Sequence, residues 1–157
     1  MRDQLKRLED LQRHDAKIQE LESSLRAIPL KLAATENDLQ RVEGVPEAAY
    51  AQLAGRYGHV AHDVLALASE FPGPVLDGMP DLMAEVVHAV RREQARSVGD
   101  VLLRRTRLGL TAARPLLASD APERVAAVVA AELGDDADGL ARAFRVEAEQ
   151  EGILVAP

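Results

Sequence analysis

The feature that most limits how this chain can fold is a heptad repeat of apolar residues near its N-terminus. One apolar residue recurs every seven positions and a second series falls three positions after it: Leu11, Ile18, Leu25, Leu32 and Leu39, then Leu21, Ile28 and Val42. This spacing gathers the side chains on one seam of an α-helix, as in coiled coils. The second series is weak at His14 and Thr35. We predict a helical arm whose seam packs on a second chain or helix, or else on its own domain.

Pro29 lies inside the repeat. A proline there removes the backbone hydrogen bond to the carbonyl of Leu25, because its nitrogen carries no hydrogen. We therefore expect the arm to be kinked near Pro29 or to form two helices.

The composition of the chain changes after residue 43. Lysine occurs at positions 6, 17 and 31, whereas every later basic residue is arginine. The net charge is −1 over residues 1–43 and −6 over residues 44–157. Gly44 suits the end of one helix and Pro46 the first turn of another. We predict two domains, the arm over residues 1–43 and a helical domain over residues 44–157.

The overall composition excludes several classes of protein. The net charge of −7 makes nucleic acid and anionic membranes poor partners, and no cysteine is present for disulfides or zinc. No apolar run approaches the roughly 18 residues that span a bilayer, and the charged N-terminus does not match a signal peptide. We expect a cytoplasmic protein without a membrane span.

Residues 44–157 read as helices separated by turn signals. Aromatic residues make up 3% of the chain, so the core must be built from Leu, Val and Ala, which favours helix over sheet. Pro72-Gly73-Pro74 and Gly134 are breaks, and Ser97 with Asp100 has the spacing of a capping box. No sustained two-residue alternation occurs. We predict an all-α fold, the arm being followed by a bundle of about five to six helices.

Residues 85–110 hold six of the eleven basic residues beyond Gly44. The polar residues that we single out in this run are Glu85, Glu93, Arg96, Asp100, Arg104, Arg105 and Thr106. On a helix, Asp100 can pair with Arg104, and Glu93 with Arg96. Our first interpretation is that these residues join helices within the bundle. An anion or phosphate site is the rival interpretation, and the acidic net charge disfavours a nucleic-acid patch.

Histidines between residues 59 and 88 raise a further, weaker hypothesis, that of a metal site. His59, His62 and Asp63 fall within one helical turn, and His88 could join them in space. Metal binding would require these ligands to converge, whereas histidines three apart on a helix are more often surface residues. We assign no metal ligand and no catalytic residue.

Several short motifs are spread over residues of about 46–150: Arg56-Tyr57-Gly58, residues 84–90, Arg92-Glu93, Ala95-Arg96, Asp100-Val101-Leu102, residues 104–109 and Glu132-Leu133-Gly134. Through these motifs, this part of the chain resembles the C-terminal domain of flavin-dependent glycerol-3-phosphate dehydrogenases. The resemblance implies an all-helical cap that follows a catalytic flavoprotein domain. In that family the flavin and glycerol phosphate sites lie in the preceding domain. No G-x-G-x-x-G occurs here, so we expect no cofactor on this chain and FAD only through family association.

The arm, residues of about 1–43, resembles the opening coiled coil of C4-type zinc-ribbon proteins. The likeness lies in residues 2–22, and the zinc cysteines of that family are absent here. It therefore implies neither a zinc site nor a function for this chain.

Two main functional hypotheses follow from these observations. The first is a non-catalytic interaction or structural module that forms a homo-oligomer through its arm. The second is a detached subunit or fragment of a glycerol-3-phosphate dehydrogenase, which would place it in glycerol metabolism beside a separate FAD-binding chain. A binder of phosphorylated metabolites that uses the arginines is a third. We expect no enzymatic activity from this chain alone.

Overall fold

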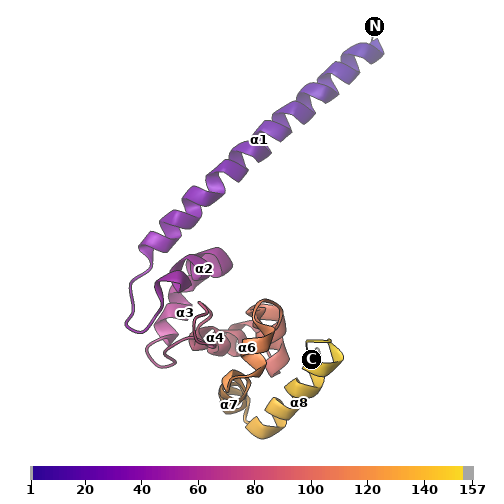
Figure 1. Ribbon diagram of the computed structural model, residues 1–157. Coiled ribbons are helices and arrows are strands. Elements are labelled where there is room, and N and C mark those ends of the chain that lie inside the picture. The colour runs from indigo at the N-terminus through magenta and orange to yellow at the C-terminus, as the bar shows by residue number, and fades with distance from the viewer. Residues whose placement is uncertain (1, 154–157) are drawn as a thin grey trace.

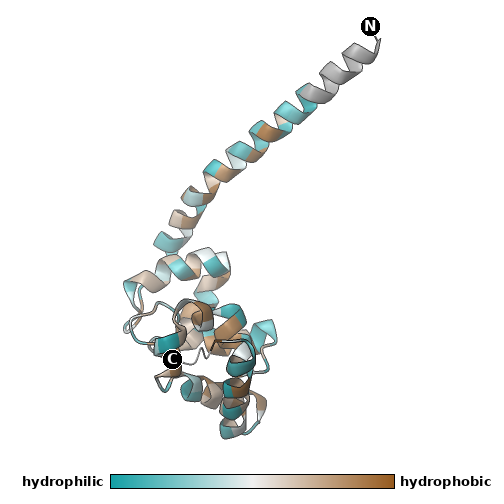
Figure 2. Ribbon diagram, turned by 45° about the vertical axis from the view of Figure 1, so that its right-hand side comes forward, coloured by the Kyte–Doolittle hydropathy of each residue, from teal (hydrophilic) through white to brown (hydrophobic). Residues whose placement is uncertain are grey.

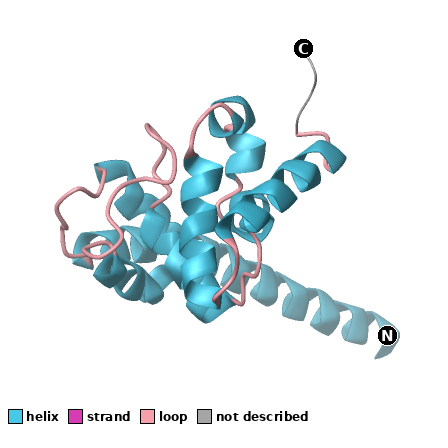
Figure 3. Cartoon of the chain, turned by 90° about the horizontal axis from the view of Figure 1, so that it is seen from below, coloured by secondary structure: helices cyan, strands magenta, loops and turns pink. Residues whose placement is uncertain are grey.

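A computed structural model describes the backbone of residues 2–153 and the side chains of residues 12–153. Figure 1 shows a long N-terminal helix that projects from a bundle of shorter helices. In chain order the elements are α1 (Arg2–Asp38), α2 (Glu47–Tyr57), the 3₁₀ turn η1 (Gly58–Val60), α3 (Ala61–Leu67), α4 (Met83–Glu93), the π-helical turn η2 (Asp100–Arg105), α5 (Leu108–Thr111), α6 (Ala113–Leu117), α7 (Ala121–Leu133) and α8 (Ala137–Gln150). Over residues 2–153 no strand is present (Figure 3), and the predicted all-α class is confirmed.

Helix α1 continues without interruption through Pro29. It does not divide in two, and Figure 1 shows one rod without a sharp bend. Proline removes a single backbone hydrogen bond, and the carbonyl of Leu25 that loses it lies on an exposed helix where water can reach it. The remaining hydrogen bonds are sufficient to carry the helix on to Asp38.

The segment that follows α1 is anchored on the body of the molecule. Leu39 is buried and Val42 is partly buried, both against α2 and α3. The amide of Val42 donates to the hydroxyl of Tyr50 at 2.7 Å, and the guanidinium of Arg41 lies 4.0 Å from the centre of the Tyr50 ring. Assigning Leu39 and Val42 to the arm seam was therefore wrong. The helix ends at Asp38, so both residues leave the heptad register.

Helix α4 is the centre of the body. Its residues from Met83 to Ala89 are all buried, because α3, α7 and η2 pack around it. Leu82 and Ala84 belong to a smaller apolar cluster with α2, α3 and Leu39. Met83, Val86 and Ala89 belong to a larger cluster shared with α7, α8 and η2. A single helix thus joins the two halves of the core.

The ends of several helices are fixed by capping residues, among them the predicted Ser97, Asp100 and Gly134. The Ser97 hydroxyl accepts from the amide of Asp100 at 3.0 Å, and the Asp100 carboxylate accepts from the amide of Ser97 at 3.1 Å. Gly134 ends α7 with a φ of +74°, a conformation that glycine adopts without strain. Asp136 caps α8 by accepting from the amides of Asp138 and Gly139.

The loop between α3 and α4 closes on itself. The amide of Val75 donates to the carbonyl of Asp81 at 2.7 Å, and that of Met83 to Gly73 at 3.0 Å. Val75 and Leu76 are buried in the core, as the apolar side chains of a packed loop must be. Among the described helices, none is long and apolar enough to cross a membrane.

Candidate functional site

A buried ionic cluster joins α2 to the start of α4. One nitrogen of the Arg56 guanidinium, Nη1, lies 2.9 Å from Oδ1 of Asp81 and also pairs with Oε1 of Glu85. The two carboxylates are 3% and 1% exposed. The second oxygen of Glu85 accepts from the amide of Leu82 at 2.7 Å, which satisfies the first turn of α4. Each acidic group therefore has a partner, as buried charges require.

Burial and charge act in opposite directions within this cluster. Burial raises the pKa of Glu85, and the neighbouring charge of Arg56 only partly offsets that rise. Burial lowers the pKa of Arg56, but Glu85 and Asp81 outweigh it and hold the pKa above its ordinary value. Arg56 therefore stays cationic and cannot exchange a proton near neutral pH. The cluster is suited to holding α2 on α4 rather than to acid–base chemistry.

An open cavity lies beside this cluster. The rings of Tyr57 and His88 meet edge to face, with their centres 5.3 Å apart. The cavity measures about 530 Å³ and is lined by Arg56, Tyr57, Val60, Asp63, His88, Arg92 and Glu93. Burial, followed by the charges of Glu85 and Glu93, raises the pKa of Tyr57 far above its ordinary value. Tyr57 therefore stays protonated, and the cavity mixes cationic and acidic walls rather than presenting one sign of charge.

The histidines of the metal hypothesis do not form a common site in the described part of the chain. Asp63 and His88 both line the open cavity, whereas His62 lines a separate one with Leu65. His59 is exposed on η1. Over residues 12–153 no group of three potential ligands has the geometry to hold a metal ion.

Arg105 lies in η2 and its guanidinium reaches back to the end of α4. Its Nη2 donates to the carbonyl of Glu93 at 2.6 Å, and its Nε lies 3.1 Å from the Glu93 carboxylate. Its Nη1 donates to the carbonyl of Asp100 at 3.2 Å. The carbonyl of Glu93 is at the C-terminal end of α4, where backbone acceptors lack partners and a cation is favourable. Arg105 therefore joins α4 to η2.

Asp100 and Arg104 form the predicted pair, and Arg104 also reaches another helix. Nη1 of Arg104 lies 3.5 Å from Oδ1 of Asp100 and 3.0 Å from Oε1 of Glu147 on α8. Oδ2 of Asp100 accepts from the amide of Arg96 at 2.9 Å. Burial tends to raise the pKa of Asp100, but hydrogen bonds from Arg96 and Ser97 outweigh it and hold the pKa below its ordinary value. The Asp100 carboxylate is thus ionised and structural.

Two expectations about this run are not met. Arg96 does not pair with Glu93, because α4 ends at Glu93 and Gln94 turns to a φ of +59°. Glu93 pairs with Arg105 instead. Thr106 is buried, and its hydroxyl donates to the carbonyl of Val101 at 3.1 Å. The Thr106 hydroxyl therefore does not face a solvent-accessible anion.

The arginines of the run join different helices rather than converging. Arg91 on α4 makes two 2.7 Å contacts with Glu132 on α7, while Arg104 pairs with Glu147 and Arg105 with Glu93. The exposed remainder is Arg92, Arg96 and Arg107. A phosphate site would require several guanidinium groups directed at one point. The described geometry does not provide such a point.

The arm seam is exposed over most of its described length. The side chains of Ile18, Leu21, Leu25, Ile28 and Leu32 are 39% to 64% exposed. Figure 2 shows apolar residues spaced along a helix that is otherwise hydrophilic and stands clear of the body. The side chain of Leu11 lies outside the described residues. Over the described residues, no segment of the body covers these five side chains, which we call the arm stripe.

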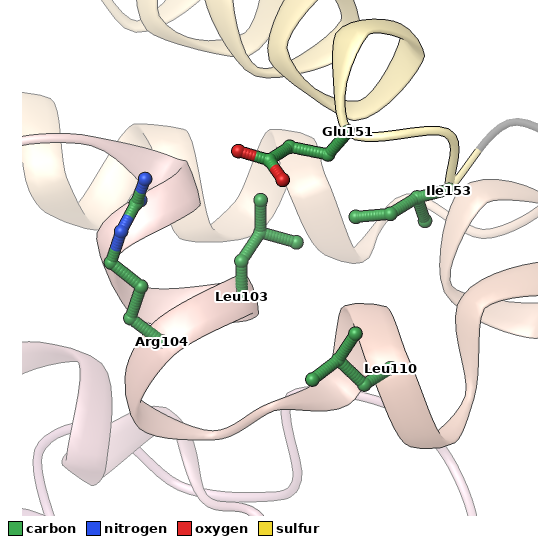
Figure 4. Close-up of a pocket in the computed structure, with 5 residues that line it drawn as sticks. All are labelled: Leu103, Arg104, Leu110, Glu151 and Ile153. Atoms are coloured by element: carbon green, nitrogen blue, oxygen red, sulfur yellow. The ribbon is translucent and has the colours of Figure 1, made fainter.

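A small pocket lies between η2, α5 and the end of α8. It measures about 200 Å³ and is lined by Leu103, Arg104, Leu110, Glu151 and Ile153. In Figure 4 the side chains of Leu103 and Ile153 point into it, and Arg104 and Glu151 lie at its edge. Its volume is below the roughly 300–1,000 Å³ that is typical of small-molecule pockets.

Sequence reasoning did not identify the contact between Arg56 and Asp81. The two residues are 25 positions apart, and only the fold brings α2 against the loop that precedes α4. One signal was present, because Glu85 occupies the third position of its helix, where glutamate often caps the first turn. Arg56 and Glu85 were also both among the residues that carried the family resemblance.

Comparison with known proteins agrees with the resemblance of the body. A model of the C-terminal domain of alpha-glycerophosphate oxidase matches residues 18–139. Glycerol-3-phosphate dehydrogenase 1 of Mycobacterium tuberculosis (strain ATCC 25618 / H37Rv) and that of Mycobacterium bovis (strain ATCC BAA-935 / AF2122/97) are each 46% identical over 69 residues. These residues are 43% of this chain and 13% of each relative, so the chain matches only a small part of those proteins. No solved structure matches.

The comparisons bear differently on the arm. The family match begins at residue 18, inside α1, and so includes all five residues of the arm stripe. The resemblance of residues 1–43 to zinc-ribbon coiled-coil proteins gains no support from any comparison. The domain boundary at residue 44 stays a prediction.

Proposed function

The chain belongs to the family of the C-terminal domain of alpha-glycerophosphate oxidase, and we propose that it is a non-catalytic helical module which self-associates through α1. The observation that carries this proposal is the arm stripe. Five large apolar side chains lie at a and d positions of consecutive heptads, and each is at least 39% exposed. Exposed apolar residues at such spacing are typical of a helix that pairs with another.

The body supports this proposal because it is complete without the stripe. Its apolar clusters include residues from α2 to α8, and its buried acidic residues Asp81 and Glu85 have ionic partners. The polar residues of the 85–110 run connect neighbouring helices through ion pairs. We therefore propose that α1 mediates self-association and that the body is the domain which α1 brings together. We propose no phosphate site.

Light scattering coupled to size exclusion tests the proposal. We expect the full chain to elute as a dimer or larger oligomer. The double variant Leu25→Lys and Ile28→Lys places two charges on the stripe and should elute as a monomer. The control is Ser23→Lys, on the opposite face of α1, which should keep the oligomer. A wild-type chain that stays monomeric at high concentration would refute self-association.

A second candidate function is docking on a separate flavoprotein chain. The observation that favours it is the 46% identity with glycerol-3-phosphate dehydrogenase 1, a protein of which this chain matches only 13%. The test mixes this chain with the M. tuberculosis enzyme from which the matching C-terminal segment has been removed. Co-elution of flavin absorbance with this chain would support docking. Separate elution at micromolar concentrations of both chains would count against it.

A further inference from the structure

We infer that α1 pairs with a second copy of this chain in a parallel, in-register arrangement; this inference rests on the proposed self-association. The heptads place Ile18, Leu25 and Leu32 at position a, with Leu21 and Ile28 at position d. Positions g and e flank this seam and set orientation and register through their charges. The charge pattern at these flanking positions carries the inference.

The flanking charges are segregated by position. Position g holds Lys17, Ser24 and Lys31, whereas position e holds Glu22, Pro29 and Glu36. In a parallel pair, each g residue faces the e residue five positions later in the other chain. Lys17 then faces the partner's Glu22, and Lys31 faces the partner's Glu36. By symmetry each contact occurs twice, which gives four attractive pairs.

An antiparallel pair gains no comparable attraction. There g faces g and e faces e. The antiparallel alignment that overlaps the whole stripe sets Lys17 near the partner's Asp38, but it also sets Asp15 near the partner's Glu36. Attraction and repulsion therefore cancel. Sliding one antiparallel chain by a heptad adds repulsion, because Lys17 then faces the partner's Lys31.

Register is restricted in the same way. If one parallel chain slides by seven residues, Lys31 of that chain faces the partner's Pro29 and all four of these attractive pairs are broken. Only one new attraction, between Lys17 of that chain and the partner's Asp15, replaces them. Towards the N-terminus, Asp10 would face the partner's Asp15, a like-charge contact, and the side chain of Asp10 lies outside the described residues. We therefore limit the paired segment to residues 17–36.

The described contacts leave these charges available for pairing. Lys17 and Lys31 form no ion pair within residues 12–153, and the acidic side chain of Glu36 has no ionic partner there. Glu22 lies 3.8 Å from Arg26, but both side chains are more than half exposed. Such a contact is weak and compatible with a second partner.

Cysteine cross-linking tests the orientation, because the chain has no cysteine of its own. Ile18→Cys places a thiol at an a position near one end of the stripe. In a parallel, in-register dimer, two such thiols adjoin, and mild oxidation should give a covalent dimer. Ser23→Cys, on the outer face, is the control and should stay uncross-linked. A mixture of Ile18→Cys and Thr35→Cys chains should join one variant to the other only if the helices run antiparallel.

Charge reversal supplies an independent readout. Lys31→Glu should weaken a parallel dimer by on the order of tenfold, since it turns two attractive contacts into repulsive ones, and adding Glu36→Lys chains should restore association. In the antiparallel alignment Lys31 faces the partner's Ser24, so Lys31→Glu would change little and Glu36→Lys would strengthen the dimer. Ser23→Glu, on the outer face, is the charge control.

The outcomes separate this inference from the proposed function. Cross-linking of Ile18→Cys together with weakening by Lys31→Glu supports the parallel pair. A wild-type dimer that cross-links only between Ile18→Cys and Thr35→Cys would overturn the orientation and leave self-association standing. A wild-type monomer at every concentration would overturn both.

Discussion

The arm and the body differ in which kinds of side chain they expose and which they bury. In α1 the large apolar side chains are exposed, and Leu25 is 64% open to solvent. In the body it is charged groups that are buried, and Glu85 is 1% exposed beside Arg56. A buried charge is tolerated when its partner is already within the fold, whereas an exposed apolar seam is favourable only when a partner covers it. In the described part of the chain, the buried charges of the body have partners, whereas the apolar seam of α1 is left exposed.

The largest expected contrast comes from truncating one apolar side chain in each region. Phe144 is 1% exposed in the core, so Phe144→Ala should reduce the free energy of unfolding of the body by about 3–5 kcal/mol. Leu25→Ala should change it by less than about 0.5 kcal/mol at concentrations where the chain is monomeric. Urea denaturation followed by circular dichroism measures both. Equal losses would show that the arm is part of the body's core.

Removing the cation of the buried cluster should have the next largest effect. Arg56→Met leaves Asp81 and Glu85 buried without a partner, which should cost about 3 kcal/mol near pH 7. Arg145→Met, which removes an exposed pair with Glu123, is the matched control and should cost about 0.5 kcal/mol.

The pH dependence of the Arg56→Met variant sharpens this prediction. Without the cation, the pKa of Glu85 in the folded state rises further above its unfolded value, because the charge of Arg56 no longer opposes the effect of burial. The folded state then binds more protons than the unfolded state, so the variant should regain stability as pH falls towards about 5. A deficit that stays constant between pH 7 and pH 5 would contradict the assigned role of the cluster.

A smaller effect is expected at the cap between α4 and η2. Asp100→Asn should cost about 1–2 kcal/mol at pH 7, because the carboxylate accepts from the amides of Arg96 and Ser97. The pKa of Asp100 is lowered in the folded state. Its contribution is therefore complete above the ordinary pKa and is lost as pH falls below about 4. Denaturation curves at low pH should therefore give the same free energy of unfolding for the wild type and the variant. A difference that persists there would show that the loss does not depend on the charge of the Asp100 carboxylate.

The smallest effect should come from the exposed pair between α4 and α7. Glu132→Gln removes the carboxylate that contacts Arg91 twice, and we expect a loss of about 0.5–1 kcal/mol. The hydrogen bond from Arg91, followed by its charge, holds the pKa of Glu132 below its ordinary value. The loss should shrink in high salt, because exposed charges are screened. Thermal denaturation at low and high salt measures it.

Local signals in the sequence were sufficient for much of the fold. Heptad spacing predicted α1, and the capping pair of Ser97 and Asp100 formed as its spacing required. Gly134 ended α7 because its left-handed conformation suits a helix terminus. These features depend on residues close together in the chain, which is why a single sequence reveals them.

Contacts between distant segments could not be predicted in the same way. The pair of Arg56 and Asp81 depends on how α2 meets the loop before α4. Leu39 continued the heptad spacing, yet it packs on the body because α1 stops one residue earlier. Likewise Glu93 pairs with Arg105 rather than with Arg96, since Gln94 turns the chain out of the helix.

Helix melting at several protein concentrations tests the central claim most directly. An exposed helix gains little stability in water without packing, so α1 should depend on its second copy. We predict two transitions by circular dichroism: one from the arm, whose midpoint rises with concentration, and one from the body, whose midpoint does not. A single transition at the same temperature at every concentration would contradict the division into a self-associating arm and a self-sufficient body.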